Sequence, residues 1–283
     1  MRRSEHRFAA VLARTLREGT RALYRDPAVY DALYRRRRHD VRFYVELAQR
    51  HGGPVLELGT GSARVAAAIA TAGVEVVGVD AAKEMLARAR ARIAKLPKPI
   101  AARVELRRGD LRKLALGRRF PLVIAPFHTL SHLYAARDLL AALAVCRAHL
   151  APGGRLGLDV AMPDLARLVQ DPDRAYAAGQ LYVPEHGTRF RLREASHYDA
   201  LRQIRTTVFL LDPVRGPGTA RAIPLTQRQI FPVELEQLLD SAGFEIERRD
   251  GDFDGGPLDE ASESQVVIAR VKARVPVPRR RRR

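Results

Sequence analysis

The sequence has little cysteine, few aromatic residues and no long apolar run. Its 283 residues include one cysteine, Cys146, so an internal disulfide is impossible and a thiolate metal cluster is not indicated. The longest apolar run, 139–146, is much shorter than the roughly 18 residues of a membrane helix. The basic N-terminus lacks the apolar core of a secretory signal, and no residue pattern has metal-ligand spacing. We therefore expect a cytoplasmic protein without a metal.

Acidic residues are scarce relative to basic ones, with 32 against 50 and a net charge of +18. Such a charge suits nucleic-acid binding, because lysine and arginine neutralise phosphates. However, 45 of the 50 basic residues are arginines, and they are spread along the chain apart from 35–38 and 279–283. Tryptophan is absent and aromatic residues make up 6%, which leaves little for base stacking. We expect no nucleic-acid partner, and a monomer or homodimer.

Hydrophobic periodicity divides the chain into several parts. Helical spacing over 8–25 and 40–50 predicts an N-terminal cap, and short apolar runs that alternate with helical stretches then predict βαβ units. A later stretch with proline, glycine and strand-like segments predicts an antiparallel lid. The expected division is cap 1–50, cofactor-binding core 51–161, substrate lid 162–230, the rest of the core 231–273 and a disordered basic tail 274–283.

The core segments predict an α/β fold with a Rossmann-like sheet of seven strands and helices on both faces. A turn at 152–154 is expected to start the fifth strand, and a hairpin-like connection at 251–257 makes the last strand antiparallel to an otherwise parallel sheet. The lid strands are expected at 189–198, 201–211 and 221–230. The seven core strands are expected at 54–58, 75–79, 103–107, 121–125, 154–160, 244–249 and 265–272, with helices at 62–72, 82–95, 135–150 and 232–242.

A glycine turn follows the first predicted strand, in the segment 55–64. Gly59 and Gly61 let the backbone approach a ligand closely, and the following helix offers unpaired N–H groups. Arg64 stands where a dinucleotide site has its third glycine. Glu57, just before the glycines, disfavours a polyphosphate and suits a ligand with an amine and a sulfonium. The segment therefore predicts a site for a cationic ligand.

Two further acidic residues follow neighbouring strands. Asp80 ends the second strand, 21 residues after Gly59, where a carboxylate can accept hydrogen bonds from ribose hydroxyls. Asp110 follows the third strand in the same way. Each signal is weak alone, but the ordered set is fairly specific.

With these residues in view, the segment 54–160 resembles the S-adenosylmethionine (SAM)-binding core of class I methyltransferases of the small-molecule type. The resemblance implies SAM as cofactor and S-adenosylhomocysteine (SAH) as product. Ala63 departs from the pattern, since many relatives have glycine there. The implied cofactor-binding residues are Glu57, Gly59, Thr60 and Gly61 for the methionine part, Asp80 for the ribose, and Ala81, Met85, Asp110 and Leu111 for the adenine.

The acceptor side is marked by the end of the fourth strand, because strand ends line the ligand crevice in open α/β sheets. Pro126 is expected at the cofactor, and His128 is the candidate general base, with His132 a weaker one. Tyr30 and Tyr34 resemble the tyrosine-bearing segment that covers the methyl donor in glycine and amino-sugar N-methyltransferases. Tyr30 is thus a cofactor candidate and Tyr34 a catalytic one.

Structural roles compete with several of these assignments. Asp80 could cap the next helix, Met85 could simply fill the core, and Asp110 could shape a turn. The two tyrosines could only pack beneath the cap, and a loop histidine is often structural. Asp252 and Asp254 lie on the crevice side of the sheet and could attract a cationic acceptor, although a solvated turn suits them as well.

The sequence thus predicts SN2 transfer of a methyl group from SAM to nitrogen or oxygen of a small molecule or short peptide. Two alternatives stay open, an RNA methyltransferase and a SAM-binding protein without catalysis. A nicotinamide oxidoreductase is disfavoured by Glu57 and Arg64.

Overall fold

The computed structural model describes residues 18–19 and 21–273, so most of the predicted first helix and the basic tail lie outside the described residues. A seven-stranded sheet forms the centre, in the order β10-β11-β5-β4-β1-β2-β3. β11 is antiparallel to both of its neighbours and the other pairings are parallel, which confirms the predicted fold class. The strands are β1 (Val55–Leu58), β2 (Val76–Asp80), β3 (Val104–Arg108), β4 (Phe120–Ala125), β5 (Leu150–Ala161), β10 (Phe244–Asp250) and β11 (Ser264–Val271).

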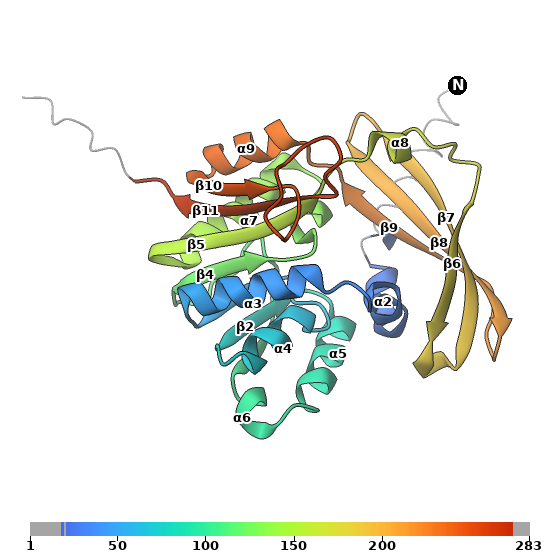
Figure 1. Cartoon of the computed structure of the whole chain (residues 1–283), viewed down its shortest axis with the longest axis horizontal. Helices are drawn as coiled ribbons and strands as arrows, with labels where there is room; N and C mark the ends of the chain where they lie inside the picture. The colour runs from blue at the N-terminus through green and yellow to red at the C-terminus, as the bar shows by residue number, and fades with distance from the viewer. Residues whose placement is uncertain (1–17, 20, 274–283) are drawn as a thin grey trace, which may run out of the picture.

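Helices cover both faces of this sheet (Figure 1). Side chains alternate along a strand, so Leu56 and Leu58 of β1 pack with α7 and α9, whereas Val55 packs with α3 and α4. No helix within the described ranges is long and apolar enough to cross a membrane. The helices are α3 (His39–His51), α4 (Arg64–Thr71), α5 (Lys83–Ile93) and the short α6 (Lys98–Ala101) on one side, with α7 (Ala136–His149) and α9 (Pro232–Ser241) on the other.

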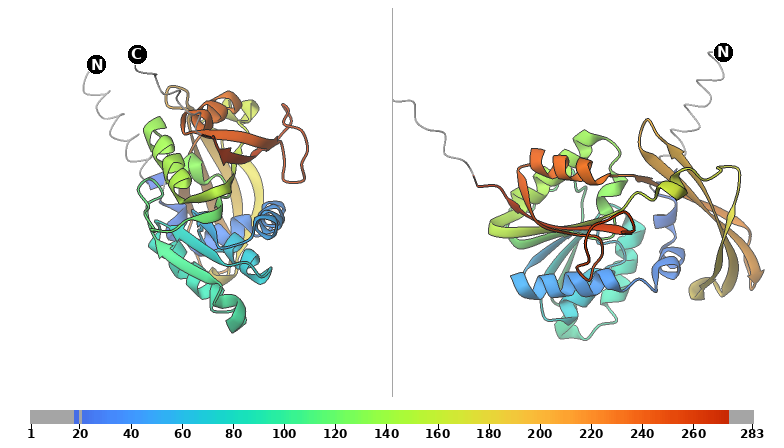
Figure 2. Two further views of the ribbon diagram at one scale, coloured as in Figure 1. Left: turned by 90° about the vertical axis from the view of Figure 1, so that its left-hand side faces the viewer. Right: turned by 45° about the horizontal axis from the view of Figure 1, so that its top comes forward.

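A second, four-stranded antiparallel sheet lies beside the core, and we call it the lid sheet. Helix α2 (Pro27–Tyr34) lies between this sheet and the core, as Figures 1 and 2 show. Apolar residues of α2 and of η1 (Leu23–Arg25) pack against the sheet in one cluster. The lid strands, in sheet order, are β6 (Tyr176–Val183), β7 (Thr188–Asp199), β8 (Ile204–Arg215) and β9 (Arg221–Arg228), with η3 (Pro184–His186) joining the first two and α8 (Leu165–Leu168) preceding them.

The structure corrects the sequence analysis at three places. Helix α2 lies between the two segments of predicted helical spacing, 8–25 and 40–50, and was missed; Pro27 is its first residue, and the Asp26 side chain caps it by accepting from the Val29 N–H at 3.1 Å. The residues 152–154 lie inside β5, at an irregularity in its pairing with β4, rather than in a turn before it. Strand β6 was missed because most of its residues are exposed, so it lacks an apolar pattern.

A buried ion pair ties α3 to the start of α4. The Asp40 carboxylate has no exposed surface and accepts from the Arg64 guanidinium at 2.8 Å and 2.5 Å. Although burial opposes it, the Arg64 hydrogen bonds hold the pKa of Asp40 below its usual value. The arginine that replaces a glycine of the dinucleotide pattern therefore has a structural partner on the cap side of the sheet.

Asp40→Asn is expected to lower the free energy of unfolding by about 3 kcal/mol, because Arg64 would stay largely buried without its counter-charge. The matched control is Glu46→Gln, which breaks the exposed pair of Glu46 with Arg42 on the same helix and should cost less than about 1 kcal/mol. Urea denaturation of both variants measures the difference. Equal losses would contradict the account of this ion pair.

Candidate functional site

The turn between β1 and α4 is built from residues in the left-handed region. Gly59 and Gly61 have φ of 70° and 56°, and Ala63 has φ of 58°. A Cβ atom on Gly59 would collide with the side chain of Thr129, which lies in η2 (Thr129–His132) after β4. Glycine at position 59 thus lets two strand ends approach each other. Ala63 adopts a backbone conformation that glycine reaches more easily than alanine, which is a physical reason for the glycine that the family pattern has at this position.

Two carboxylates lie beside this turn, one buried and one half-buried. Glu57 is 2% exposed and accepts from the Thr60 hydroxyl at 2.8 Å. Half-buried Asp80 accepts from the backbone N–H groups of Gly61 and Ala82, each at 2.8 Å. Within the described residues, neither carboxylate has an ion-pair partner. Both acids therefore lack a cation.

Burial has a direct effect on the protonation of these acids. It raises the pKa of Glu57 to about 8, against the opposing effects of the Thr60 hydrogen bond and the Arg64 charge. Burial likewise raises the pKa of Asp80, although backbone N–H groups stabilise its charged form. A cationic ligand would favour the ionised form of both.

Aromatic residues from the cap lie close to Asp80. The ring centroids of Tyr30 and Tyr34 lie 5.0 Å apart, and Tyr34 lies 4.8 Å from the Phe127 ring. Tyr24 packs on Tyr30 at 5.7 Å. Burial, the neighbouring tyrosines and the Asp80 carboxylate together raise the pKa of Tyr24. The cap thus brings three protonated tyrosines to the same place as Asp80.

Asp31 of α2 holds the cap in this position. One of its oxygens accepts from the Ser62 hydroxyl of the glycine turn at 2.7 Å. The other accepts from Arg88 at 2.7 Å and Arg92 at 3.0 Å, both on α5. Arg88 also reaches Glu185 of the lid at 2.6 Å. One carboxylate therefore links the cap, the glycine turn and, through Arg88, the lid sheet.

Asp159 of β5 shapes the turn that follows β4. Phe127 and His128 both have left-handed backbone angles, with φ of 55° and 58°. Their N–H groups donate to the fully buried Asp159 carboxylate at 2.7 Å and 3.3 Å, and the Tyr44 hydroxyl donates to it at 2.7 Å. This carboxylate stabilises a strained turn that presents Phe127 to the cap tyrosines.

The two histidines of this turn are weak bases. Burial and the nearby Arg37 charge lower the pKa of His128 to about 3, and burial lowers that of His132 to about 4. His128 Nδ1 lies 3.3 Å from Asp159 without hydrogen-bond alignment, whereas His132 Nε2 lies 2.7 Å from the Tyr24 hydroxyl. Both imidazoles are neutral at physiological pH.

The structure brings most of the predicted site residues to one edge of the sheet. Met85 is buried and its Cε faces Gly61, while the Pro126 carbonyl accepts from Thr129 beside Gly59. Asp80 is the last residue of β2, and the helix cap that competed with ligand binding is not formed, because Ala82 is the N-cap of α5 and Asp80 accepts from its N–H in a turn before the helix. The residues gathered at this edge are Tyr30, Tyr34, Glu57, Gly59, Thr60, Gly61, Asp80, Met85, Pro126 and His128.

The predicted adenine contacts form the outer part of this edge. Asp110 accepts from the Arg112 backbone and side chain, which lowers the pKa of its carboxyl to about 2. Leu111 is half-buried against the core and Ala81 is exposed after β2. Their roles in binding stay predictions.

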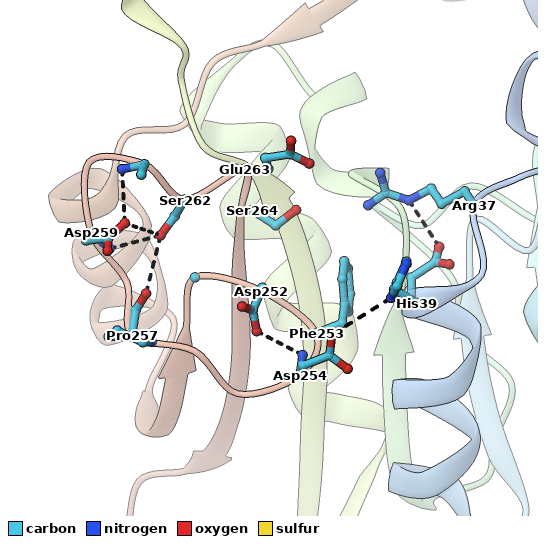
Figure 3. Close-up of a pocket in the computed structure, with 13 residues that line it drawn as sticks. Arg37, His39, Asp252, Phe253, Asp254, Pro257, Asp259, Ser262, Glu263 and Ser264 are labelled. Carbon is cyan, nitrogen blue, oxygen red and sulfur yellow. Dashed lines mark hydrogen bonds and ion pairs between the residues drawn. The ribbon is translucent and has the colours of Figure 1, made fainter.

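A cavity of about 430 Å³ lies between the start of α3 and the β10–β11 loop, away from the glycine turn (Figure 3). Its lining contains none of the predicted cofactor residues. Asp252 accepts from the backbone of Asp254 and Gly256 at 2.9 Å and 2.8 Å, and Asp254 lies 3.8 Å from His39. Asp252 thus has a turn role, and attraction of a cationic acceptor by these acids stays a prediction.

Sequence reasoning missed Tyr24, Asp31 and Asp159 as parts of this site. Asp159 carried one usable signal, an acidic residue in the middle of an apolar strand, where a charge needs a specific partner. Asp31 and Tyr24 carried none, because their partners are distant in the sequence.

The comparisons with known proteins agree with this geometry. Residues 56–156 match a family model described as a methyltransferase domain. The CcbJ methyltransferase from Streptomyces caelestis is 29% identical, with a TM-score of 0.71 over 83% of this chain and 90% of its own. No curated protein matches the chain significantly.

Two similar structures contain the methyl donor. CalS10, an amino pentose methyltransferase from Micromonospora echinaspora with SAM bound, is 24% identical over 85% of this chain and 95% of its own, with a TM-score of 0.61. The glycopeptide N-methyltransferase MtfA in complex with SAM is 23% identical over 82% of this chain and 87% of its own, with a TM-score of 0.59. At these identities, the two structures show a similarity of fold alone.

Glu57→Gln is expected to change how stability depends on pH in the ligand-free protein. Because the folded pKa is about 8 and the ordinary value 4.5, the folded wild type binds the extra proton between these values. Its stability should therefore fall as pH rises, by up to about 1.4 kcal/mol per pH unit relative to the variant. Chemical denaturation at pH 5, 6, 7 and 8 measures this, and parallel profiles would refute the buried acid.

Proposed function

We infer that the chain is a class I SAM-dependent methyltransferase, and we propose that its acceptor is an amine nitrogen of a small molecule or short peptide. When bound, SAM supplies an electrophilic methyl group on a sulfonium and leaves as SAH. The observation that carries the proposal is a pair of acids without a basic partner, the buried Glu57 and the half-buried Asp80, with the cap tyrosines beside Asp80.

The residues present fit this donor. Asp80 uses one oxygen for each of two backbone N–H groups, and a carboxylate has about four lone-pair positions, so two ribose hydroxyls can still donate to it. Glu57 lies beside the glycine turn, where an ammonium group would supply its missing counter-charge. Met85, buried next to Gly61, offers an apolar contact for the adenine.

An amine suits the acceptor side better than a hydroxyl does. A hydroxyl must lose its proton as it reacts, which calls for a base, whereas a neutral amine can react with its own lone pair. His128 and His132 are both held neutral and weakly basic by burial. SAM held by Glu57 and Asp80 would supply its methyl group to the nitrogen lone pair, its sulfur would keep the electron pair of the broken bond, and water would take the proton of the ammonium product.

Alignment and exclusion of water are then the main contributions of the protein. Tyr30, Tyr34 and Phe127 form an aromatic wall that fixes the line of approach, and Asp31 holds that wall closed over the glycine turn. His128 is thus proposed as a wall residue rather than as a base. Tyr34 remains the catalytic candidate that touches the reacting atoms.

The names of two similar structures support an amine acceptor, since one is an amino pentose methyltransferase and the other an N-methyltransferase of glycopeptides.

The proposal includes a cytoplasmic location, a monomer or homodimer, and no nucleic-acid partner. RNA is the main rival acceptor because the net charge is +18. Labelled SAM incubated with a metabolite extract and with total RNA separates the two, and label on RNA alone would overturn the proposal.

Asp80→Ala is expected to weaken SAM binding about 10- to 100-fold, which is the usual loss for hydrogen bonds to a charged group. Glu105→Ala on the neighbouring strand β3 is the control, because this exposed acid only pairs with Arg107 and Arg118 and should leave affinity unchanged. Isothermal titration with SAM gives both values. Wild-type affinity in the Asp80 variant would show that the ribose assignment is wrong.

A further inference from the structure

The face of the lid sheet toward α2 changes character along its strands. Near α2 it is apolar, with Phe190, Leu192 and Phe209 in the cluster that packs on the cap. Side chains alternate along a strand, so the same face continues with polar residues. The strand register pairs Glu194 with Phe209, Ser196 with Thr207 and Tyr198 with Arg205. We call Glu194, Ser196, Tyr198, Arg205 and Thr207 the polar half of the lid face.

Arg205 stands out in this polar half. Its side chain is half-buried, and its Nε donates to the Ser196 hydroxyl at 3.0 Å. Across residues 18–19 and 21–273 no carboxylate lies within 4 Å of its guanidinium. Arg64 and Arg228, which are also mostly buried, pair with Asp40 and Glu234 respectively.

The electrostatic surroundings of Arg205 differ from those of a paired arginine. Burial and the nearby Arg167 charge lower the pKa of Arg205, against the opposing charges of Glu194 and Asp164, whereas the pKa of Arg64 is raised by Asp40 in spite of burial. Neither Glu194 nor Asp164 forms an ion pair with Arg205, and a guanidinium has five N–H donors, of which one meets Ser196. Donors of Arg205 are therefore left for an anion from outside the chain.

Tyr34 links this face of the lid to the proposed site, because it packs on the apolar half of the face that Arg205 continues. Its ring contacts Phe127 on the core side. On the lid side, burial and the Glu194 charge raise the pKa of Tyr34, while the Arg37 and Arg205 charges oppose the rise. Charges from the lid thus lie close to the tyrosine that we proposed at the reacting atoms.

We propose that Arg205 binds an anionic group of the acceptor, a carboxylate or a phosphate, while the amine of the same molecule lies toward Glu194 and Tyr34. This inference rests on the proposed function, because it names the substrate class of the same site. The planar guanidinium matches both kinds of anion with paired hydrogen bonds. Glu194 lies toward Tyr34 on the same face, so an ammonium group gains a counter-charge as the anion does.

The test uses three amines that share a two-carbon chain, namely ethanolamine, O-phosphoethanolamine and β-alanine. Each is titrated into the SAH-saturated full chain by calorimetry. The wild type should bind at least one anionic amine about tenfold or more tightly than ethanolamine, as expected for charge-assisted hydrogen bonds. Preference for O-phosphoethanolamine identifies a phosphate acceptor, and preference for β-alanine a carboxylate.

Three variants locate the effect. Arg205→Gln should reduce the preference to less than about twofold, and Arg205→Lys should keep only part of it, because lysine retains the charge without the planar fork. Arg193→Gln is the matched control, since Arg193 lies on β7 and pairs with Asp212, and it should behave as the wild type. All variants should bind SAH with wild-type affinity.

Two results would overturn the proposal while leaving the proposed function intact. The first is SAH binding by the wild type with no preference for either anionic amine. The second is a preference that Arg205→Gln retains in full. Failure of the wild type to bind SAH would instead overturn both the cofactor assignment and this inference.

Discussion

Removing a carboxylate from water without a cation is costly, yet two neighbouring strands of this protein each carry such an acid. Glu57 in β1 is buried, Asp80 at the end of β2 is half-buried, and their partners are a hydroxyl and backbone N–H groups rather than a basic side chain. The glycine turn and the two strands hold both acids at one edge of the sheet. In the proposed function, a cationic nucleoside supplies the missing counter-charge.

The cap, the turn after β4 and the lid sheet pack around this edge. Asp31 draws the cap onto the glycine turn, and Asp159 stabilises the strained turn that completes the aromatic wall. The lid sheet packs its apolar half on the cap, and we propose that its polar half meets the acceptor. Tyr34 packs on both the lid cluster and Phe127 of the core, so the proposed donor and acceptor sites share it.

The sequence predicted the sheet well, since strand period and glycine turns are local signals. Glu57 lies in β1 and Asp80 ends β2, at the edge of the sheet where the donor site stays a prediction. Strand β6 was missed because only Leu181 and Val183 of its residues are buried. Arg205 and Asp159 act through partners remote in the chain, and the weak basicity of His128 depends on its burial. Such features require the folded structure.

The most direct measurement of the central claim is a crystal structure of the protein with SAH. The account predicts that the ribose hydroxyls contact the Asp80 carboxylate, that the amino group lies toward Glu57, and that the sulfur faces Tyr34. The nucleoside seated instead in the cavity beside Arg37 and Asp252, with the Asp80 oxygens bonded only to backbone, would contradict it.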